Sequence, residues 1–131
     1  TNVITASVLD ASNNIVGFVQ DVTTPSRRFS FGPRVDFAIN ENNTLQTRYE
    51  FSRNTVDNQG IGGFNLLSRA SSSTNTSHEF RMTESMIINP KTVNEFRFQF
   101  DYNNSQRTGD NSIPSINVNN AFNGGGAQVG L

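Results

Sequence analysis

The sequence predicts an all-β fold, an antiparallel meander of long amphipathic hairpins, and three observations carry that prediction. Polar and apolar residues alternate strictly over several stretches, which places the apolar residues on one face of a strand. No segment keeps apolar residues at the i, i+3, i+4 and i+7 spacing of an amphipathic helix. The abundance of Asn, Ser, Thr and Gly also disfavours stable helices.

Before the clear strands, residues 1–26 form an extracellular-loop-like segment. Two apolar stretches flank the turn-like residues 10–14, so this segment could form a short hairpin. Four long strands then follow, and they are predicted at 27–39, 44–54, 74–88 and 92–103.

The four strands differ in how clean their alternation is. In the last one, Phe96, Phe98, Phe100 and Tyr102 alternate with Glu95, Arg97, Gln99 and Asp101. In the third, Glu84 shares the apolar face with His78, Phe80, Met82 and Met86, which makes it the weakest of the four.

The connections alternate between short and long. Residues 40–44 and 89–91 are expected to be tight turns, and Pro90 suits the second. A long loop is expected at 55–73, and residues 104–131 are expected to be a Gly- and Asn-rich outer loop or tail. Short turns at one end of the strands and long loops at the other are typical of outer-membrane barrels.

The apolar face favours lipid over a soluble core for three reasons. The segment 28–39 has twelve residues, which is enough for the roughly 9–11 residues that a tilted strand needs to cross a bilayer. The face is dominated by Phe, with Tyr toward the loop ends of the strands, where aromatic girdles lie. The opposite face carries charges of both signs. The residues predicted to face lipid or a core are Phe29, Phe31, Val35, Phe37, Tyr49, Phe51, Phe80, Phe96, Phe98, Phe100 and Tyr102.

One register of the first hairpin satisfies both faces at once. If paired residue numbers sum to 84, Arg34 faces Glu50 and Asp36 faces Arg48, giving cross-strand ion pairs on the polar face. Val35 then faces Tyr49 on the apolar face. The carboxylates Glu79, Glu95 and Asp101 also have Arg nearby on their own polar faces, which indicates structural charge pairs rather than an acid–base pair.

Composition excludes several functions. A net charge of −1 leaves no basic face for nucleic acid. The absence of Cys excludes disulfides and thiolate metal sites, and the single histidine, His78, is weak evidence for a metal ligand. Neither Gly60–Gly63 nor Gly124–Gly126 fits a phosphate-binding loop. We therefore expect no enzymatic activity, no cofactor and no metal site.

The residues from Arg27 to Gly130 resemble part of the barrel of a TonB-dependent receptor. The type is Oar-like, with a carboxypeptidase-regulatory-like N-terminal domain. The resembling stretches are TPSRRFSFGPRVDFAINENNTLQTRYEFSRN (24–54), NQGIGGFNLLSR (58–69), VNEFRFQF (93–100) and PSINVNNAFNGGGAQVG (114–130). The resemblance implies a bacterial outer-membrane transport receptor with a 22-stranded barrel, an N-terminal plug and energy supplied by the TonB complex. Against that pattern, this chain is expected to be a barrel fragment of a few strands with their outer loops.

Three hypotheses about function remain open. The first is a barrel segment that forms wall and outer loops of the receptor, with outer-membrane lipid and the remainder of the barrel as partners. Because four strands cannot close a barrel alone, the second is self-assembly with other copies through strand edges, which would give an oligomeric barrel or an extracellular filament. The third is a soluble β-domain that binds a partner through its long loops. The transported substrate is not encoded in any motif.

Overall fold

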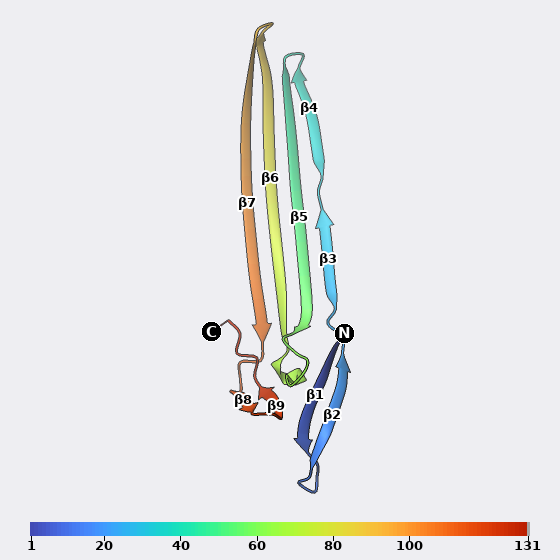
Figure 1. Cartoon of the computed structure of the whole chain (residues 1–131). Coiled ribbons are helices and arrows are strands. Elements are labelled where there is room, and N and C mark those ends of the chain that lie inside the picture. Colours follow the sequence, from blue (N-terminus) through green and yellow to red (C-terminus); the bar gives the residue numbers. More distant parts are fainter. Residues whose placement is uncertain (131) are drawn as a thin grey trace. The chain divides into compact units, whose positions relative to one another are not determined.

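The computed structural model of the chain describes residues 1–130, and its regular structure is almost entirely β-strand (Figure 1). The strands are β1 (Asn2–Leu9), β2 (Ile15–Val22), β3 (Ser26–Phe31), β4 (Arg34–Asn40), β5 (Asn43–Gln59), β6 (Ser71–Asn89), β7 (Thr92–Gly109), β8 (Ser115–Val118) and β9 (Phe122–Gly125). A 3-10 turn, Leu67–Arg69, lies between β5 and β6. Among the described residues, no helix is long and apolar enough to cross a membrane.

The strands form three antiparallel sheets. The largest follows the order β3-β5-β6-β7, with β4 also paired to β5, and its strands run side by side in Figure 1. The hairpins β1–β2 and β8–β9 form the other two. The all-β antiparallel fold predicted from the sequence is therefore confirmed.

Asparagine side chains shape both tight turns of the large sheet. The Oδ1 atom of Asn40 accepts hydrogen bonds from the Asn42 backbone N–H at 2.9 Å and from the Asn43 amide at 2.9 Å. In the second turn, Asn89 Oδ1 accepts from the Lys91 backbone N–H at 3.0 Å. Each Asn thus closes a two-residue connection by mimicking a backbone turn.

The strand bounds differ from those predicted. Gly32 and Pro33 divide the expected strand 27–39 into β3 and β4, because proline has no N–H to donate to a neighbouring strand. Tyr49 still donates its backbone N–H to the Pro33 carbonyl at 3.0 Å. The strands β5, β6 and β7 extend past the apolar alternation by several residues, so the expected loop 55–73 shrinks to residues 60–70.

The two terminal segments both contain hairpins, of which the sequence indicated only the first. Residues 1–26 include the β1–β2 hairpin, as the sequence allowed, and in it Asn2 pairs with Val22 and Leu9 with Ile15. Residues 104–131, expected to be a loop or tail, include the end of β7 and the β8–β9 hairpin. Leu131 lies outside the described residues.

The register predicted for the first hairpin is wrong. Arg34 lies opposite Arg48 rather than Glu50, and Asp36 lies opposite Gln46 rather than Arg48. Val35 accordingly lies opposite Thr47 rather than Tyr49.

The turn explains this error. The Asn40 turn is shorter than the five-residue loop expected at 40–44, and the register shifts between Ala38 and Asn40. The pairing is displaced by two residues, and a displacement of two keeps every side chain on its predicted face.

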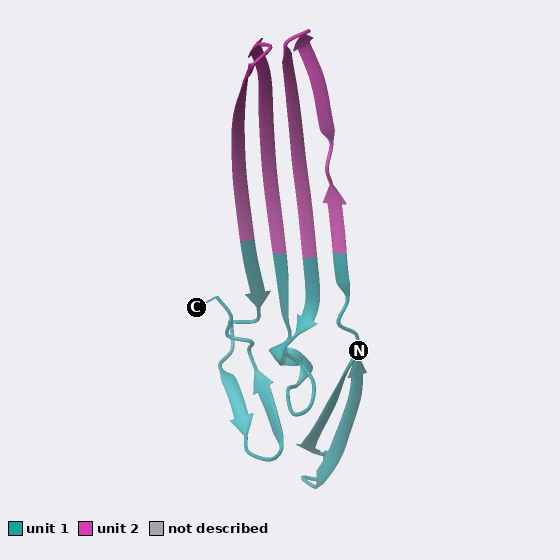
Figure 2. Cartoon of the chain, turned by 45° about the horizontal axis from the view of Figure 1, so that its top comes forward, with its two compact units in different colours: residues 1–27, 55–74, 105–131 teal, residues 28–54, 75–104 magenta. Residues whose placement is uncertain are grey.

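The chain divides into two compact units, coloured separately in Figure 2. Unit 1 comprises residues 1–27, 55–74 and 105–131, and unit 2 comprises residues 28–54 and 75–104. Unit 1 holds the buried apolar side chains of the described residues, which are those of Ile4, Ala6 and Ile61. Unit 2 is a section of the large sheet without such a core.

Backbone hydrogen bonds between loops hold unit 1 together. Thr5 donates its N–H to the Gly63 carbonyl at 2.7 Å, and Gly63 donates to the Val3 carbonyl at 2.8 Å. The N–H of Asn123 donates to Phe64 at 2.7 Å. The β1–β2 hairpin, the 60–70 loop and the β8–β9 hairpin therefore form one folded group rather than three independent loops.

Candidate functional site

One face of the unit 2 sheet is apolar and exposed. Along β3, β4 and β7, the predicted apolar residues are between 45% and 62% exposed, and these are Phe29, Phe31, Val35, Phe37, Phe96, Phe98, Phe100 and Tyr102. Those on β5 and β6 are half-buried, and these are Tyr49, Phe51 and Phe80. A contiguous exposed apolar surface of this kind is uncommon in soluble monomers and marks a surface that another apolar phase or partner covers.

An aromatic row crosses this face from strand to strand. The ring of Phe29 lies 6.1 Å from that of Phe51, and Phe51 lies 5.1 Å from the imidazole of His78 with an edge-on geometry. The next member, Tyr102 on β7, lies 5.9 Å from His78. The Tyr49 hydroxyl lies 2.7 Å from His78 Nδ1, within hydrogen-bonding distance. His78 is thus part of the aromatic face, and sequence spacing had already placed it there with Phe80.

The other face of the sheet carries ion pairs that run along strands. Arg34 Nε donates to Asp36 Oδ1 at 3.0 Å on β4, and Arg48 Nη2 donates to Glu50 Oε2 at 3.2 Å on β5. The residues predicted to pair across strands are therefore paired, but each with the residue two positions along its own strand. Because residues i and i+2 share a face, such pairs need no particular cross-strand register.

The next two strands repeat the arrangement. On β6, Arg81 pairs with Glu79, and on β7, Arg97 pairs with Glu95. The carboxylate of Asp101 accepts instead from the Gln99 amide at 2.8 Å. Four neighbouring strands thus carry one arginine–carboxylate pair each, which we call the ionic band. All its members are partly exposed, so each pair contributes little to stability.

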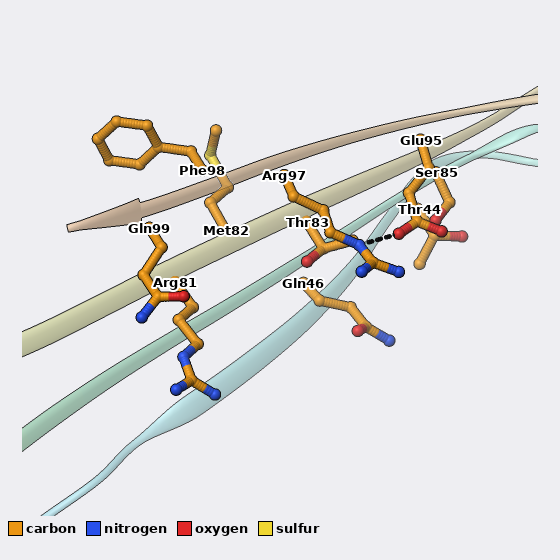
Figure 3. Close-up of a pocket in the computed structure, with 10 residues that line it drawn as sticks. All are labelled: Thr44, Gln46, Arg81, Met82, Thr83, Ser85, Glu95, Arg97, Phe98 and Gln99. Carbon is orange, nitrogen blue, oxygen red and sulfur yellow. Dashed lines mark hydrogen bonds and ion pairs between the residues drawn. The ribbon is translucent and has the colours of Figure 1, made fainter.

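A shallow groove of about 500 Å³ lies along this face of unit 2. Figure 3 shows that Arg81, Thr83, Gln46 and Arg97 project from one side of the strands, whereas Phe98 and Met82 project from the other. The strictly alternating sequence therefore produces two chemically distinct faces, one ionic and one aromatic.

Most of the ionisable side chains of the two faces lie in ion pairs or among aromatic rings. Among residues 1–130, no group of three or more His, Asp or Glu side chains is placed to hold a metal ion. The carboxylates of the ionic band are each occupied by an arginine or an amide, and His78 lies among aromatic rings on the opposite face. What the faces can do is separate an apolar environment from a polar one.

Unit 1 contains a separate polar cluster that sequence reasoning did not identify. Arg107 donates from Nε and Nη2 to the hydroxyl of Ser71, at 3.1 and 3.0 Å, and Ser71 is buried. The guanidinium of Arg69 donates to the Gly126 carbonyl at 2.6 Å. Arg107 and Ser71 are separated by 36 positions in the sequence, and Arg69 and Gly126 by 57 positions. No local sequence pattern therefore predicts these contacts.

A chain of asparagine side chains ties two loops of unit 1 together. The Asn117 amide donates to Asn123 Oδ1 at 2.6 Å, and the Asn123 amide donates to Asn65 Oδ1 at 2.9 Å. The high Asn content of the sequence was the only available signal for this network. On the apolar side of β8–β9, Val118 and Phe122 line a hollow of about 390 Å³ with residues 7–9 and Ile15.

Two exposed carboxylates of unit 1 stabilise tight turns. Asp10 accepts hydrogen bonds from the backbone N–H groups of Asn14 at 2.9 Å and Ser12 at 2.8 Å, which lower the pKa of the Asp10 carboxyl below its usual value. Asp110 accepts from the hydroxyl and the backbone N–H of Ser112, and these bonds lower its pKa likewise.

The comparisons with known proteins agree with this architecture. No curated protein and no solved structure shows a significant match to the chain. One family model, described as an outer membrane beta barrel domain, matches residues 2–130. That match covers nearly the whole chain, including both faces of the long strands and the loops of unit 1. The chain therefore belongs to the outer-membrane β-barrel domain family and is a protein of the bacterial outer membrane.

Proposed function

We propose that this chain forms part of the barrel wall and the outer loops of a TonB-dependent outer-membrane transport receptor, with a structural role and no enzymatic activity of its own. The observation that carries the proposal is the division of each long strand into an aromatic and an ionic face. Family membership supports the barrel, and the resemblance of residues 27–130 to the Oar-like receptors supports the receptor type.

On this proposal the aromatic face of unit 2 contacts lipid. Its length fits, because the strands run from the short turns to the aromatic row over residues 43–51 of β5, 78–89 of β6 and 92–102 of β7. These segments are close to the roughly 9–11 residues that a tilted strand needs to cross a bilayer. Apolar residues dominate the aromatic face within them, with polar exceptions such as Glu84 and Asn94. The Tyr49, His78 and Tyr102 side chains lie at the end of the apolar stretch. Amphipathic rings favour this position because it matches the lipid headgroups.

Beyond that row, the strands continue without an apolar face. Residues 52–59 of β5, 71–77 of β6 and 103–109 of β7 consist almost entirely of polar residues. A strand with two polar faces is incompatible with the hydrocarbon core. We place these strand ends, and the folded loops of unit 1, in water on the outer side, and the short turns at Asn40 and Asn89 on the periplasmic side.

The ionic band then faces the lumen. A large barrel keeps its interior polar, and charges of both signs are tolerated there because water and neighbouring side chains solvate them. Arginines with in-strand carboxylates, such as Arg81 with Glu79, suit a wall that must stay hydrated without strong net charge.

The reading frame around this chain tests the receptor proposal. We expect the encoding gene to continue into further amphipathic strands on both sides and to encode an N-terminal plug. Cells that carry the intact gene should take up the receptor's solute, and this uptake should stop when a protonophore removes the proton gradient that energises the TonB complex. A reading frame that contains only these strands contradicts the proposal. Solute uptake that continues in the presence of the protonophore also contradicts it.

A second candidate function, self-assembly of this chain into an oligomer, is favoured by the strand edges. Within the described residues, β7 pairs only with β6, and every residue of β7 is exposed along its length. Unpaired backbone groups on such a long edge invite another strand. Light scattering of the chain folded in detergent separates the two candidates. A closed oligomer of defined mass supports self-assembly, whereas a monomer that pairs only when the missing strands are supplied supports the receptor segment.

A further inference from the structure

Two arginines of the ionic band lie opposite each other on neighbouring strands, and the pairing of opposite charges does not explain this. Arg34 lies directly opposite Arg48, and like charges at directly opposed positions destabilise a sheet. A register displaced by two residues would leave both faces unchanged and set Arg34 against Glu50 instead. The chain adopts the register that brings the arginines together.

Arg81 of the next strand, β6, joins this pair. Among the described residues, Arg34, Arg48 and Arg81 line one hollow of about 140 Å³ with Gln46, Thr47 and Thr83. None of the six lining residues is acidic. Three neighbouring strands therefore each place one arginine side chain around a single small hollow.

The carboxylates that accompany these arginines lie along the strands and orient the guanidinium groups. Arg34 pairs with Asp36 through Nε, Arg81 pairs with Glu79 through Nε, and Arg48 pairs with Glu50 through Nη2, so each guanidinium has further N–H groups besides the one in its ion pair. A guanidinium carries five N–H donors, and its Nη edge matches the two oxygens of a carboxylate or phosphate. The in-strand pairs hold the side chains while leaving donors for a ligand.

We propose that this arginine hollow binds an oxyanion, the carboxylate or phosphate group of a small solute. A hollow of about 140 Å³ is several times the roughly 30 Å³ that one water occupies, so it accommodates one such group with part of its hydration. A bound anion also relieves the repulsion between Arg34 and Arg48. The inference goes beyond the structural role proposed above, and it depends on the geometry of unit 2 and not on the receptor type.

Isothermal titration calorimetry on the chain folded in detergent tests the proposal, with sodium phosphate and sodium acetate titrated separately into a buffer free of both. We expect saturable binding in at least one titration, and the tighter of the two identifies the preferred group. Arg48→Gln and Arg81→Gln should each weaken that binding roughly tenfold or more, because each removes charge-assisted hydrogen bonds. Arg48→Lys should give an intermediate affinity, because lysine keeps the positive charge but lacks the planar pair of N–H donors of a guanidinium.

Arg97→Gln is the matched control. Arg97 also pairs with a carboxylate two residues along its own strand, but it does not line the hollow. Its substitution should leave the affinity unchanged. Circular dichroism confirms that each variant keeps its β-structure before titration. The proposal is overturned if neither anion binds the folded chain, or if Arg97→Gln weakens binding as much as Arg81→Gln.

Discussion

The hydroxyl of Tyr49 lies 2.7 Å from Nδ1 of His78, on a face of the sheet that is mostly aromatic and aliphatic. A polar contact in that setting has few alternative partners. We expect Tyr49→Phe to lower the free energy of unfolding by about 1 kcal/mol, because it leaves the imidazole nitrogen without its partner while keeping the ring.

Tyr102→Phe is the control for that substitution. Tyr102 contributes its ring beside His78, so its variant removes a hydroxyl from the same face without touching the Tyr49 contact. Urea titration of the protein folded in detergent, followed by circular dichroism, compares the two. Equal destabilisation by both variants would show that the Tyr49–His78 contact has no special role.

Charge on the aromatic face should be far more costly than charge on the ionic face. Phe98→Arg places a guanidinium in the proposed lipid contact, and we expect it to destabilise the folded state in bilayers by about 2–4 kcal/mol. Gln99→Arg, one residue later on β7 and on the ionic face, should change stability by less than about 1 kcal/mol. Folding titrations into lipid vesicles measure both. A larger cost for Gln99→Arg would reverse the assignment of the two faces.

The β8–β9 hairpin should depend on Gly125. This residue has a positive φ of 75°, and a Cβ added there would collide with the Pro114 carbonyl. We expect Gly125→Ala to destabilise unit 1 by more than about 1 kcal/mol, since both strain and the clash must be relieved.

Gly17, in the β1–β2 hairpin, is its matched control because a Cβ there meets no atom within 4 Å. Hydrogen exchange at the amides of unit 1 should therefore accelerate in Gly125→Ala and stay unchanged in Gly17→Ala. Unchanged exchange in both variants would contradict the strained geometry at Gly125.

The turn at Asp110 should loosen in acid. Hydrogen bonds from Ser112 lower the folded-state pKa of the Asp110 carboxyl below the ordinary value of 3.8. A lowered folded pKa gives stabilisation that is fully present above the unfolded pKa and is lost as the pH falls through the lower folded value. NMR should show the Ser112 amide shifting in that acidic window, and the shift should be absent in Asp110→Asn. An amide that titrates above 3.8 would contradict the lowered pKa.

The sequence predicts the strands and their two faces where apolar and polar residues alternate. It does not predict the parts of the strands in which both faces are polar. Phe96 to Tyr102 alternate so strictly that the faces of β7 follow from the sequence alone. Beyond Tyr102 both faces are polar, so hydropathy carries no signal, although backbone pairing extends β7 to Gly109. For the same reason, the sequence did not predict the ends of β5 and β6 that flank the 60–70 loop.

The partners of the ionic face could not be predicted for a different reason. The face on which a side chain lies depends only on whether its position is odd or even, and a two-residue displacement does not change that. The residue that lies opposite it on the next strand depends on the length of the turn. Asn40 uses its side chain to close a tighter turn than expected, and Arg34 therefore meets Arg48. The contacts of Arg107 with Ser71, in unit 1, depend on loop packing between distant segments and leave no periodic trace.

We propose that the aromatic face of the long strands contacts lipid and that the ionic face does not. The chain has no Cys, so Phe98→Cys and Gln99→Cys each offer a single labelling site for a fluorophore. In vesicles of brominated lipid, we expect strong quenching of the label at position 98 and little at position 99. Equal quenching at the two positions, or stronger quenching at position 99, would contradict the proposal.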